Sequence, residues 1–525
     1  MIRRVPVGAT VLATAFVCAL LLALPGRTVV TTYLPDLFVF LDGAHRVAAG
    51  QVPTRDFHTA FGPLVAYLPW LGLVVGGSFG AAMPVGMALL ILALAPAMAH
   101  VFASRLRPAI ALPFAAFAIL ILAVPINLGE GVTALSFGMF YNRVGWAALA
   151  TLLVMYLRPE EPRGGQALLD GLCAAALLLV MAYTKASYAL VGAAFLAFML
   201  TDAKQRLWAA GALAGTLVAA LLVEAFWRAT LLHLSDLMLA AGASGLVRGS
   251  PGQIVDHLLG NLADYVLLAL FAALAWWRFG SLRDVAFFAF CAVAGFLLVN
   301  QNFQAWGILT LHAAAAVAAE RLLRGAHPEV RPLGLGAPLL LLAMLLPPIV
   351  HCLGALGLHV AVAAGRADPP LGLPNFDRIV VANLWTWPEH EAARAYLETL
   401  ADGAAALAPL GPAKVAVLDF ANPFPAGLGL PPPRGGTAWV RWGRNMDDAH
   451  LVPAARMFRD VEVVLEPRPL PEAPALGGRG EAADGLRRAY GPYLAAHFAP
   501  VSETTHWRVH HRLAPQAVSA AETGR

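Results

Sequence analysis

The sequence predicts an α-helical polytopic membrane protein with about 11 transmembrane helices and a small C-terminal α/β domain outside the bilayer. The chain has 525 residues, of which 59% are hydrophobic and only 13% are charged, and its mean hydropathy is +0.68. A soluble domain carries about 25% charged residues. Apolar runs close to the ~20 residues that span a bilayer recur up to about residue 355 and then cease.

The apolar runs define the expected membrane helices. The run near 6–25 follows two arginines and resembles a signal peptide, but it is long and many spans follow, so we expect an uncleaved first helix. The run at 61–79 is expected to lie at the membrane surface. The other expected spans lie near 81–103, 109–126, 144–157, 167–183, 188–201, 207–227, 259–277, 284–300, 305–320 and 335–355.

The distribution of lysine and arginine sets the expected orientation. With Arg3 and Arg4 in the cytoplasm, the inside loops carry 13 cations, whereas the outside loops before residue 356 carry seven. If 61–79 were a full span, the SRLRP stretch at 104–108 would move outside and every later loop would invert. We therefore expect 11 spans in a bacterial inner membrane, with the C-terminus outside the cytoplasm.

The chain divides into three expected regions. Residues 1–355 form a membrane domain whose first outer loop is 26–80. Residues 356–515 form a soluble extracytoplasmic α/β domain, because helical patterns there alternate with buried-strand patterns. Residues 516–525 form a flexible tail. The expected helices of the soluble domain include 388–407 and 481–498, and its expected strands are 414–420, 461–467 and 505–513.

Two kinds of site are not expected. Basic residues are scattered without a run of lysine or arginine, which argues against a nucleic-acid partner. A disulfide or zinc framework is also not expected, because no cysteine pair has a suitable spacing and all cysteines lie inside apolar runs. The four cysteines are Cys18, Cys173, Cys291 and Cys352.

The first outer loop carries the first cluster of candidate site residues, because ionisable residues beside a bilayer are costly and mark functional sites. Asp36 follows Pro35 at an expected helix start, where a carboxylate also favours the positive end of the helix dipole. Asp42 lies four residues before Arg46, so a local ion pair is the alternative to a catalytic role. The two aspartates lie roughly 120° apart around a helix and are not expected to act as one pair. The other candidates in this loop are Arg55, Asp56 and His58.

Three more clusters lie on the expected outer face. Tyr141, Asn142 and Arg143 begin a span and form either an aromatic belt with a snorkelling arginine or an anion-binding site. Lys185 stands between two spans on the side where the positive-inside rule disfavours a cation. The amide-rich stretch 300–306 forms either a polar turn or part of a sugar site, through Gln301, Asn302 and Gln304.

Together these residues fit the transfer of a sugar from a lipid phosphate to an acceptor hydroxyl. A carboxylate can take the proton of the hydroxyl, and cations can stabilise the negative charge on the departing phosphate. A donor that already sits in the membrane needs no soluble nucleotide pocket, and the chain has neither a GxGxxG nor a GxxxxGK[ST] motif.

The layout resembles the GT-C superfamily of polytopic glycosyltransferases, which includes protein O-mannosyltransferases and lipid A aminoarabinose transferases. Bacterial members often carry an acid in the first outer loop, followed by Gly-x-x-Pro-x-x-Asp-Phe and then Gly-Pro before an apolar helix. Here the pattern reads Asp36, then GQVPTRDF at 50–57, then Gly62-Pro63. The resemblance implies that Asp36 is the catalytic acidic residue, with Asp42 as the rival.

The expected partners are a polyprenyl-phosphate sugar donor, membrane lipid, and a glycan, lipid or protein acceptor. No cofactor is assigned with certainty. A divalent metal is one reading of the Asp447-Asp448 pair, and an exposed turn is the other. Two further functions stay open: a transporter or flippase of lipid-linked sugars, which would carry charges along a path through the membrane, and a non-catalytic scaffold of envelope polysaccharide assembly.

Overall fold

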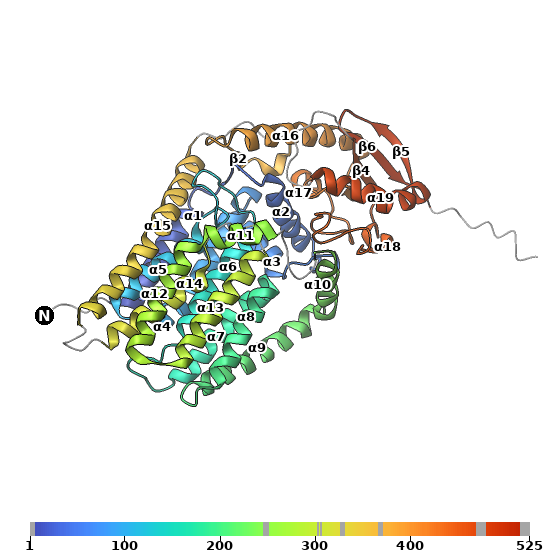
Figure 1. Cartoon of the computed structure of the whole chain (residues 1–525). Helices are drawn as coiled ribbons and strands as arrows, with labels where there is room; N and C mark the ends of the chain where they lie inside the picture. Colours follow the sequence, from blue (N-terminus) through green and yellow to red (C-terminus); the bar gives the residue numbers. More distant parts are fainter. Residues whose placement is uncertain are drawn as a thin grey trace, which may run out of the picture.

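The computed structural model describes residues 6–244, 251–301, 304, 307–325, 331–365, 371–468 and 479–514, with the side chains of 331–335 left aside. A bundle of long helices forms the larger part, and the C-terminal helices and strands lie beyond one end of this bundle (Figure 1). All four cysteines are buried as free thiols.

Six helices within the described ranges are long and apolar enough to cross a bilayer, as a multi-pass membrane protein requires. Their outer surfaces expose large apolar side chains; Phe226, for example, is 87% exposed. The six are α4 (Phe79–Arg105), α7 (Gln166–Thr184), α9 (Arg206–Trp227), α12 (Leu262–Phe279), α13 (Leu282–Asn300) and α15 (Arg331–Ala364). Shorter apolar helices are α1 (Val7–Ala23), α3 (Leu64–Gly76), α5 (Pro108–Ala123) and α8 (Ala186–Leu200).

Two further helices occupy the interior of the bundle. Every residue of α6 (Phe140–Val154) is buried, and so is almost every residue of α14 (Leu309–Arg324). The two helices pack against each other. A helix that is enclosed on all sides needs no lipid-facing surface, and it can carry small or polar side chains where neighbours satisfy them. The expected spans at 144–157 and 305–320 therefore lie in the core of the bundle.

The expected surface helix forms a hairpin with the start of the next helix. α3 has 13 residues, about 20 Å at 1.5 Å per residue, which is less than a bilayer core. Its glycines allow close packing on α4, since a Cβ added to Gly72 would lie 1.9 Å from the Ala82 carbonyl oxygen. α3 therefore runs beside the first turns of α4 as a short helical hairpin.

The segment expected as the first outer loop is fixed to the chain that follows the last bundle helix. β1 (Thr28–Val30) pairs in parallel with β2 (Ile379–Val381). α2 (Leu34–Ala48) follows β1 and begins with Pro35 and Asp36 in its first turn, as its sequence predicts. The N-terminus of α2 is thus held where the bundle meets the C-terminal region (Figure 1).

The C-terminal region contains a mixed four-stranded sheet in the order β3-β4-β6-β5. β3 and β4 are parallel, and the remaining neighbours are antiparallel. Strand β5 was not predicted from the sequence. The sequence also placed the end of the last bundle helix at residue 355, whereas α15 continues to Ala364. The strands are β3 (Val415–Val417), β4 (Val463–Pro467), β5 (Phe498–Glu503) and β6 (Trp507–Arg512). The helices of this region are α16 (Trp387–Leu407), α17 (Phe424–Leu428), α18 (Ala454–Met457) and α19 (Arg479–His497).

Two more helices complete the described bundle. α10 (Thr230–Ser244) follows α9, and α11 (Pro251–Gly260) precedes α12. α10 lies next to the C-terminal region (Figure 1), where its Asp236 contacts Arg456.

Candidate functional site

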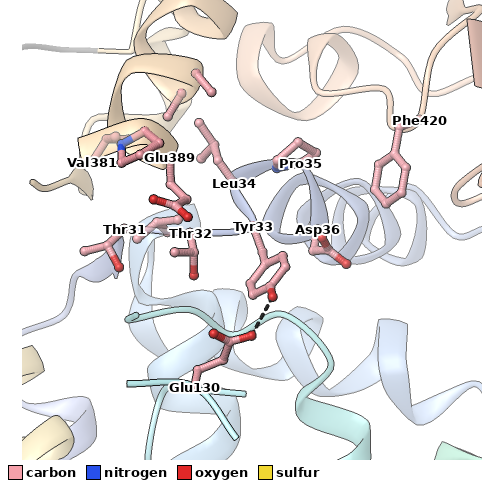
Figure 2. A pocket seen from close by; sticks show the side chains of 14 residues that line it. Thr31, Thr32, Tyr33, Leu34, Pro35, Asp36, Glu130, Val381, Glu389 and Phe420 are labelled. Atoms are coloured by element: carbon pink, nitrogen blue, oxygen red, sulfur yellow. Dashed lines mark hydrogen bonds between the residues drawn. The ribbon is translucent and has the colours of Figure 1, made fainter. Parts of the chain in front are cut away.

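A cavity of about 290 Å³ lies at the N-terminus of α2. Its walls come from the first outer loop, from the connection between α5 and α6, and from α16 with neighbouring C-terminal segments (Figure 2). Three carboxyl groups belong to the lining, each from a different part of the chain: Asp36, Glu130 and Glu389. The cavity therefore lies between the membrane bundle and the C-terminal region, and both parts contribute acidic side chains to its wall.

Asp36 is a half-buried residue in the first turn of α2, directly after Pro35. Burial raises the pKa of Asp36 to about 6, against the opposing effect of the positive charges of Arg444 and Arg441. A carboxyl group with this pKa changes its protonation state near neutral pH, as a general acid or base does. Of the expected site residues, Asp36 is the one that lines the cavity.

Tyr33 and Glu130 form the floor beside Asp36. The Tyr33 hydroxyl donates a hydrogen bond of 2.6 Å to Glu130 Oε1 (Figure 2). Tyr33 adopts the left-handed conformation with φ 57°, which costs about 1–2 kcal/mol for a residue with a side chain. Gly138 permits this arrangement, because a Cβ at that position would lie 3.2 Å from the Tyr33 Cβ. Backbone strain of this kind concentrates at functional sites.

A row of aromatic and cationic side chains connects the surroundings of Asp36 to Lys185. The Arg444 guanidinium lies 6.0 Å from the ring centre of Trp439, and this ring stacks on Phe61 at 5.2 Å. Phe61 in turn lies 4.7 Å from Tyr141, and the Lys185 ammonium lies 5.3 Å from the Tyr141 ring.

Through this row of side chains, the expected cluster around Asn142 is connected to the residues around Asp36. Lys185 Nζ donates to Asn142 Oδ1 at 3.0 Å, which joins two of the expected outer clusters. Arg143 lies on another side of α6: it is 1% exposed and donates to the carbonyl oxygen of Ile126 at 3.1 Å. Its guanidinium lies 5.9 Å from the Phe137 ring. Arg143 is thus not part of the row that contains Lys185.

Asp42 and Arg46 form a buried ion pair, with 2.7 Å between Asp42 Oδ2 and Arg46 Nε. Arg46 also donates to the carbonyl oxygens of Pro433 and Gly435. The two side chains are 1% and 2% exposed. This geometry matches the local ion pair that the spacing also predicted, and it fixes the proline-rich segment of the C-terminal region onto α2.

Arg55 and Asp56 pair with each other, and Asp56 also accepts from the backbone N–H of Val52 at 2.7 Å. His58 is buried, and its Nδ1 lies 2.8 Å from Asp236 Oδ1 on α10. Asp236 also accepts from the backbone N–H of Thr59 at 3.0 Å. These residues thus stabilise the conformation of the segment expected as the first outer loop, and they do not line the Asp36 cavity.

Asp236 is the centre of a buried connection between three parts of the chain. Besides its close contact with His58 and the hydrogen bond from Thr59, it accepts from Arg456, which also donates to the backbone carbonyl of Thr54 at 2.6 Å. Removing the carboxylate would leave these donors unsatisfied in a buried place.

We expect Asp236→Ala to lower the free energy of unfolding by about 2–4 kcal/mol and to speed proteolytic cleavage of the C-terminal region. Limited proteolysis of the purified protein in detergent measures this. Asp256→Ala, at an exposed position of α11, is the matched control and should be cleaved like the wild type. Equal cleavage rates for both variants would contradict the assigned role of Asp236.

The expected amide-rich stretch at 300–306 places the side chain of Gln304 inside the bundle. Gln304 accepts a hydrogen bond from Trp146 Nε1 at 2.8 Å and donates to the Gly307 carbonyl at 2.9 Å. Gln301 caps the C-terminus of α13. Asn302 lies outside the described residues. Neither of the two described amides lines the Asp36 cavity.

Within the described ranges, no three histidine, cysteine, aspartate or glutamate side chains are grouped so as to hold a metal ion. Asp447 accepts from the backbone N–H groups of Ala449 and His450 and contacts the His450 ring at 2.9 Å. Asp448 is 73% exposed. This arrangement matches the turn interpretation of the Asp447-Asp448 pair.

A second, mostly apolar cavity of about 380 Å³ lies between α12, α14 and α15. His351 belongs to its lining, and the Nε2 atom of this histidine is 3.0 Å from the Glu130 carbonyl oxygen. Glu130 lines the first cavity with its side chain. The two cavities have no lining residue in common, but this contact between His351 and Glu130 connects their walls.

Several residues of the site were not expected from the sequence. Arg441 and Arg444 belong to the stretch WVRWGR at 439–444, in which cations alternate with tryptophan, a pattern that is a usable signal for an anion or sugar site. Tyr33, Glu130 and Glu389 carry no such signal. No protein-family model matches the sequence, and no curated protein is significantly similar to it.

Proposed function

We propose that the chain is a membrane-embedded glycosyltransferase that moves a sugar from a polyprenyl-phosphate donor to an acceptor hydroxyl. The observation that carries this proposal is Asp36, a carboxyl group that lines a cavity and has a pKa of about 6, with the positive charges of Arg441 and Arg444 acting on it. The resemblance to the GT-C superfamily is part of the proposal. The membrane would be a bacterial inner membrane, with the cavity and the C-terminal region on the extracytoplasmic side, in accord with the excess of cations in the opposite loops.

Each part of the site has a role in this reaction. Asp36, as the carboxylate, takes the proton of the acceptor hydroxyl while the hydroxyl oxygen forms a bond to the anomeric carbon. The bond from that carbon to the phosphate oxygen breaks, and the polyprenyl phosphate leaves with the electron pair. Attack from the side opposite to the phosphate inverts the anomeric centre.

The cations and carboxylates of the cavity and of the adjoining row support the two halves of the donor. Arg441, Arg444 and Lys185 would stabilise the charge on the departing phosphate. Glu130 and Glu389 accept hydrogen bonds from sugar hydroxyls, and the rings of Trp439 and Phe61 offer apolar faces to the sugar ring. The adjoining apolar cavity at His351 suits the first isoprene units of the lipid.

The proposal is tested by adding radiolabelled polyprenyl-phosphate sugars to proteoliposomes that contain the purified chain and a mixture of candidate acceptors. A glycosyltransferase converts label into a product that no longer partitions with the donor lipid. A transporter moves the donor between leaflets without making such a product, and a scaffold does neither. Absence of a product with every donor and acceptor, together with donor movement, would replace the proposal by the transporter alternative.

The transfer rate is expected to rise with pH through about 6 and then level off, because the base is the ionised form of Asp36 and its pKa is about 6. Arg444→Gln removes a charge that lowers this pKa, so the midpoint should move to higher pH. The pH profile of kcat/KM measures the midpoint independently of the absolute rate. A midpoint that stays in place or moves to lower pH in the Arg444→Gln variant would contradict the role of Asp36 as the titrating group.

A further inference from the structure

A third cavity, of about 510 Å³, lies at the opposite end of the helix bundle. It is formed where α6, α12 and α14 end and where the connections to α9 and α13 pass. Arg158, which belongs to its lining, follows α6 at the end remote from Asn142. From Asn142 to Val154, the last residue of α6, the helix rises over 12 residue steps, or about 18 Å. This cavity is therefore separate from the one that contains Asp36.

The accessible charges in this cavity are positive. Four arginines and two aspartates belong to its lining, so the ionised groups leave an excess of two positive charges. The aspartates lie behind the arginines: the side chains of Asp202 and Asp284 are 10% and 3% exposed. The exposed fractions of the arginine side chains are larger, at 51% for Arg158, 30% for Arg283, 27% for Arg321 and 24% for Arg324.

The aspartates hold the arginines in position. Asp202 accepts from Arg158 through both oxygens, at 3.0 and 2.9 Å. Asp284 accepts from Arg321 and, at 2.5 Å, from the Tyr156 hydroxyl. A guanidinium has five N–H donors in a fixed fork, so an arginine anchored in this way still has donors left for an anion. The result is a preorganised site for a phosphate group.

The edge of the cavity has the character of a membrane interface. Phe279 lines the cavity at the end of α12, and the preceding Trp276 and Trp277 are 47% and 70% exposed. Leu282, at the start of α13, is 75% exposed. Tryptophan collects at the level of lipid headgroups, and basic pockets between the cytoplasmic ends of membrane helices bind anionic headgroups.

We infer that this cavity binds the phosphodiester headgroup of an anionic phospholipid, with Arg158, Arg283 and Arg321 on the phosphate and the acyl chains over Trp277 and Leu282. A lipid headgroup and a free phosphate share the same charged chemistry, but only the lipid makes use of the exposed tryptophan and leucine side chains at the edge. This site is independent of the proposed transfer reaction, because it shares no residue with the Asp36 cavity.

Native mass spectrometry of the purified full-length chain in detergent tests the inference. The protein is titrated with phosphatidylglycerol and, separately, with phosphatidylcholine of the same chain length. We expect phosphatidylglycerol to bind at a lipid concentration at least about tenfold lower than the concentration that phosphatidylcholine needs for the same occupancy. Equal retention of the two lipids would overturn the proposal, and this comparison needs no variant.

Two variants locate the site. Arg158→Gln combined with Arg283→Gln is expected to weaken phosphatidylglycerol binding by about tenfold or more. Arg163→Gln, at an exposed position on the same side of the bundle, is the matched control and should bind like the wild type. Equal weakening by both changes would show a diffuse charge effect and overturn the assignment to this cavity. Displacement of the lipid by millimolar inorganic phosphate would overturn the lipid assignment in favour of a soluble anion.

Discussion

Replacing Asp36 with asparagine is expected to reduce sugar transfer by at least about 100-fold. Asparagine keeps the size and polarity of the side chain, but it cannot take a proton from the acceptor hydroxyl. The loss should appear in kcat, because the proton moves during the chemical step. Single-turnover transfer from a labelled lipid-phosphate sugar in proteoliposomes measures it.

Folding of this variant should be intact or slightly improved. The pKa of Asp36 is raised by burial, so the ionised carboxylate opposes folding near neutral pH, and a neutral amide removes that cost. Glu389→Gln is the matched control inside the same cavity, and it should act mainly on KM by weakening a contact to the sugar. An Asp36→Asn protein with full activity would end the proposed role of this residue.

The same change at Asp42 is expected to have the opposite consequences. Asp42→Asn leaves the buried Arg46 guanidinium without its counter-charge at 2.7 Å, and breaking a buried ion pair costs about 3–5 kcal/mol. We therefore expect a large drop in the melting temperature and in the amount of folded protein. Thermal unfolding in detergent, followed by tryptophan fluorescence, measures the difference.

Arg46 provides the control for this second prediction. Asp42→Leu combined with Arg46→Met removes both charges, so it should be more stable than Asp42→Asn alone, although the contacts of Arg46 to Pro433 and Gly435 are lost. The folded fraction of each variant should retain transfer activity. A stable Asp42→Asn protein without activity would instead make Asp42 the catalytic acid.

Local sequence signals predicted the parts of the fold that depend on local interactions. Pro35 and Asp36 mark the start of α2 because proline suits the first turn and a carboxylate suits the positive helix end. The spacing of Asp42 and Arg46 predicted an ion pair, which the structure contains. The alternation of helices and strands after the bundle predicted the small C-terminal sheet.

Hydropathy alone does not show which apolar helices face the lipid and which are enclosed by other helices. α6 lies inside the bundle and is buried on all sides, yet its sequence has no more obvious a polar face than those of the spanning helices. The short strand β1 also escaped prediction, because its partner β2 lies some 350 residues further along the chain. Such pairing depends on tertiary structure and leaves no local periodicity.

The sequence singled out some residues of the candidate site and not others. Asp36 and Lys185 stood out because charge is costly beside a bilayer. Arg441 and Arg444 approach Asp36 only because the C-terminal region packs over α2, and one sequence without its fold does not reveal that contact. Arg143 has a similar charge signal, but its side chain faces the interior of the bundle.

Photo-crosslinking of the donor tests the central claim most directly. A polyprenyl-phosphate sugar with a diazirine on the sugar ring is bound to the protein in proteoliposomes, and the adducts are mapped by peptide mass spectrometry. The account predicts adducts on the segments around Tyr33 and Trp439, which compete with unlabelled donor. Adducts confined to the arginine cavity around Arg283, or spread evenly over the lipid-facing helices, would contradict it.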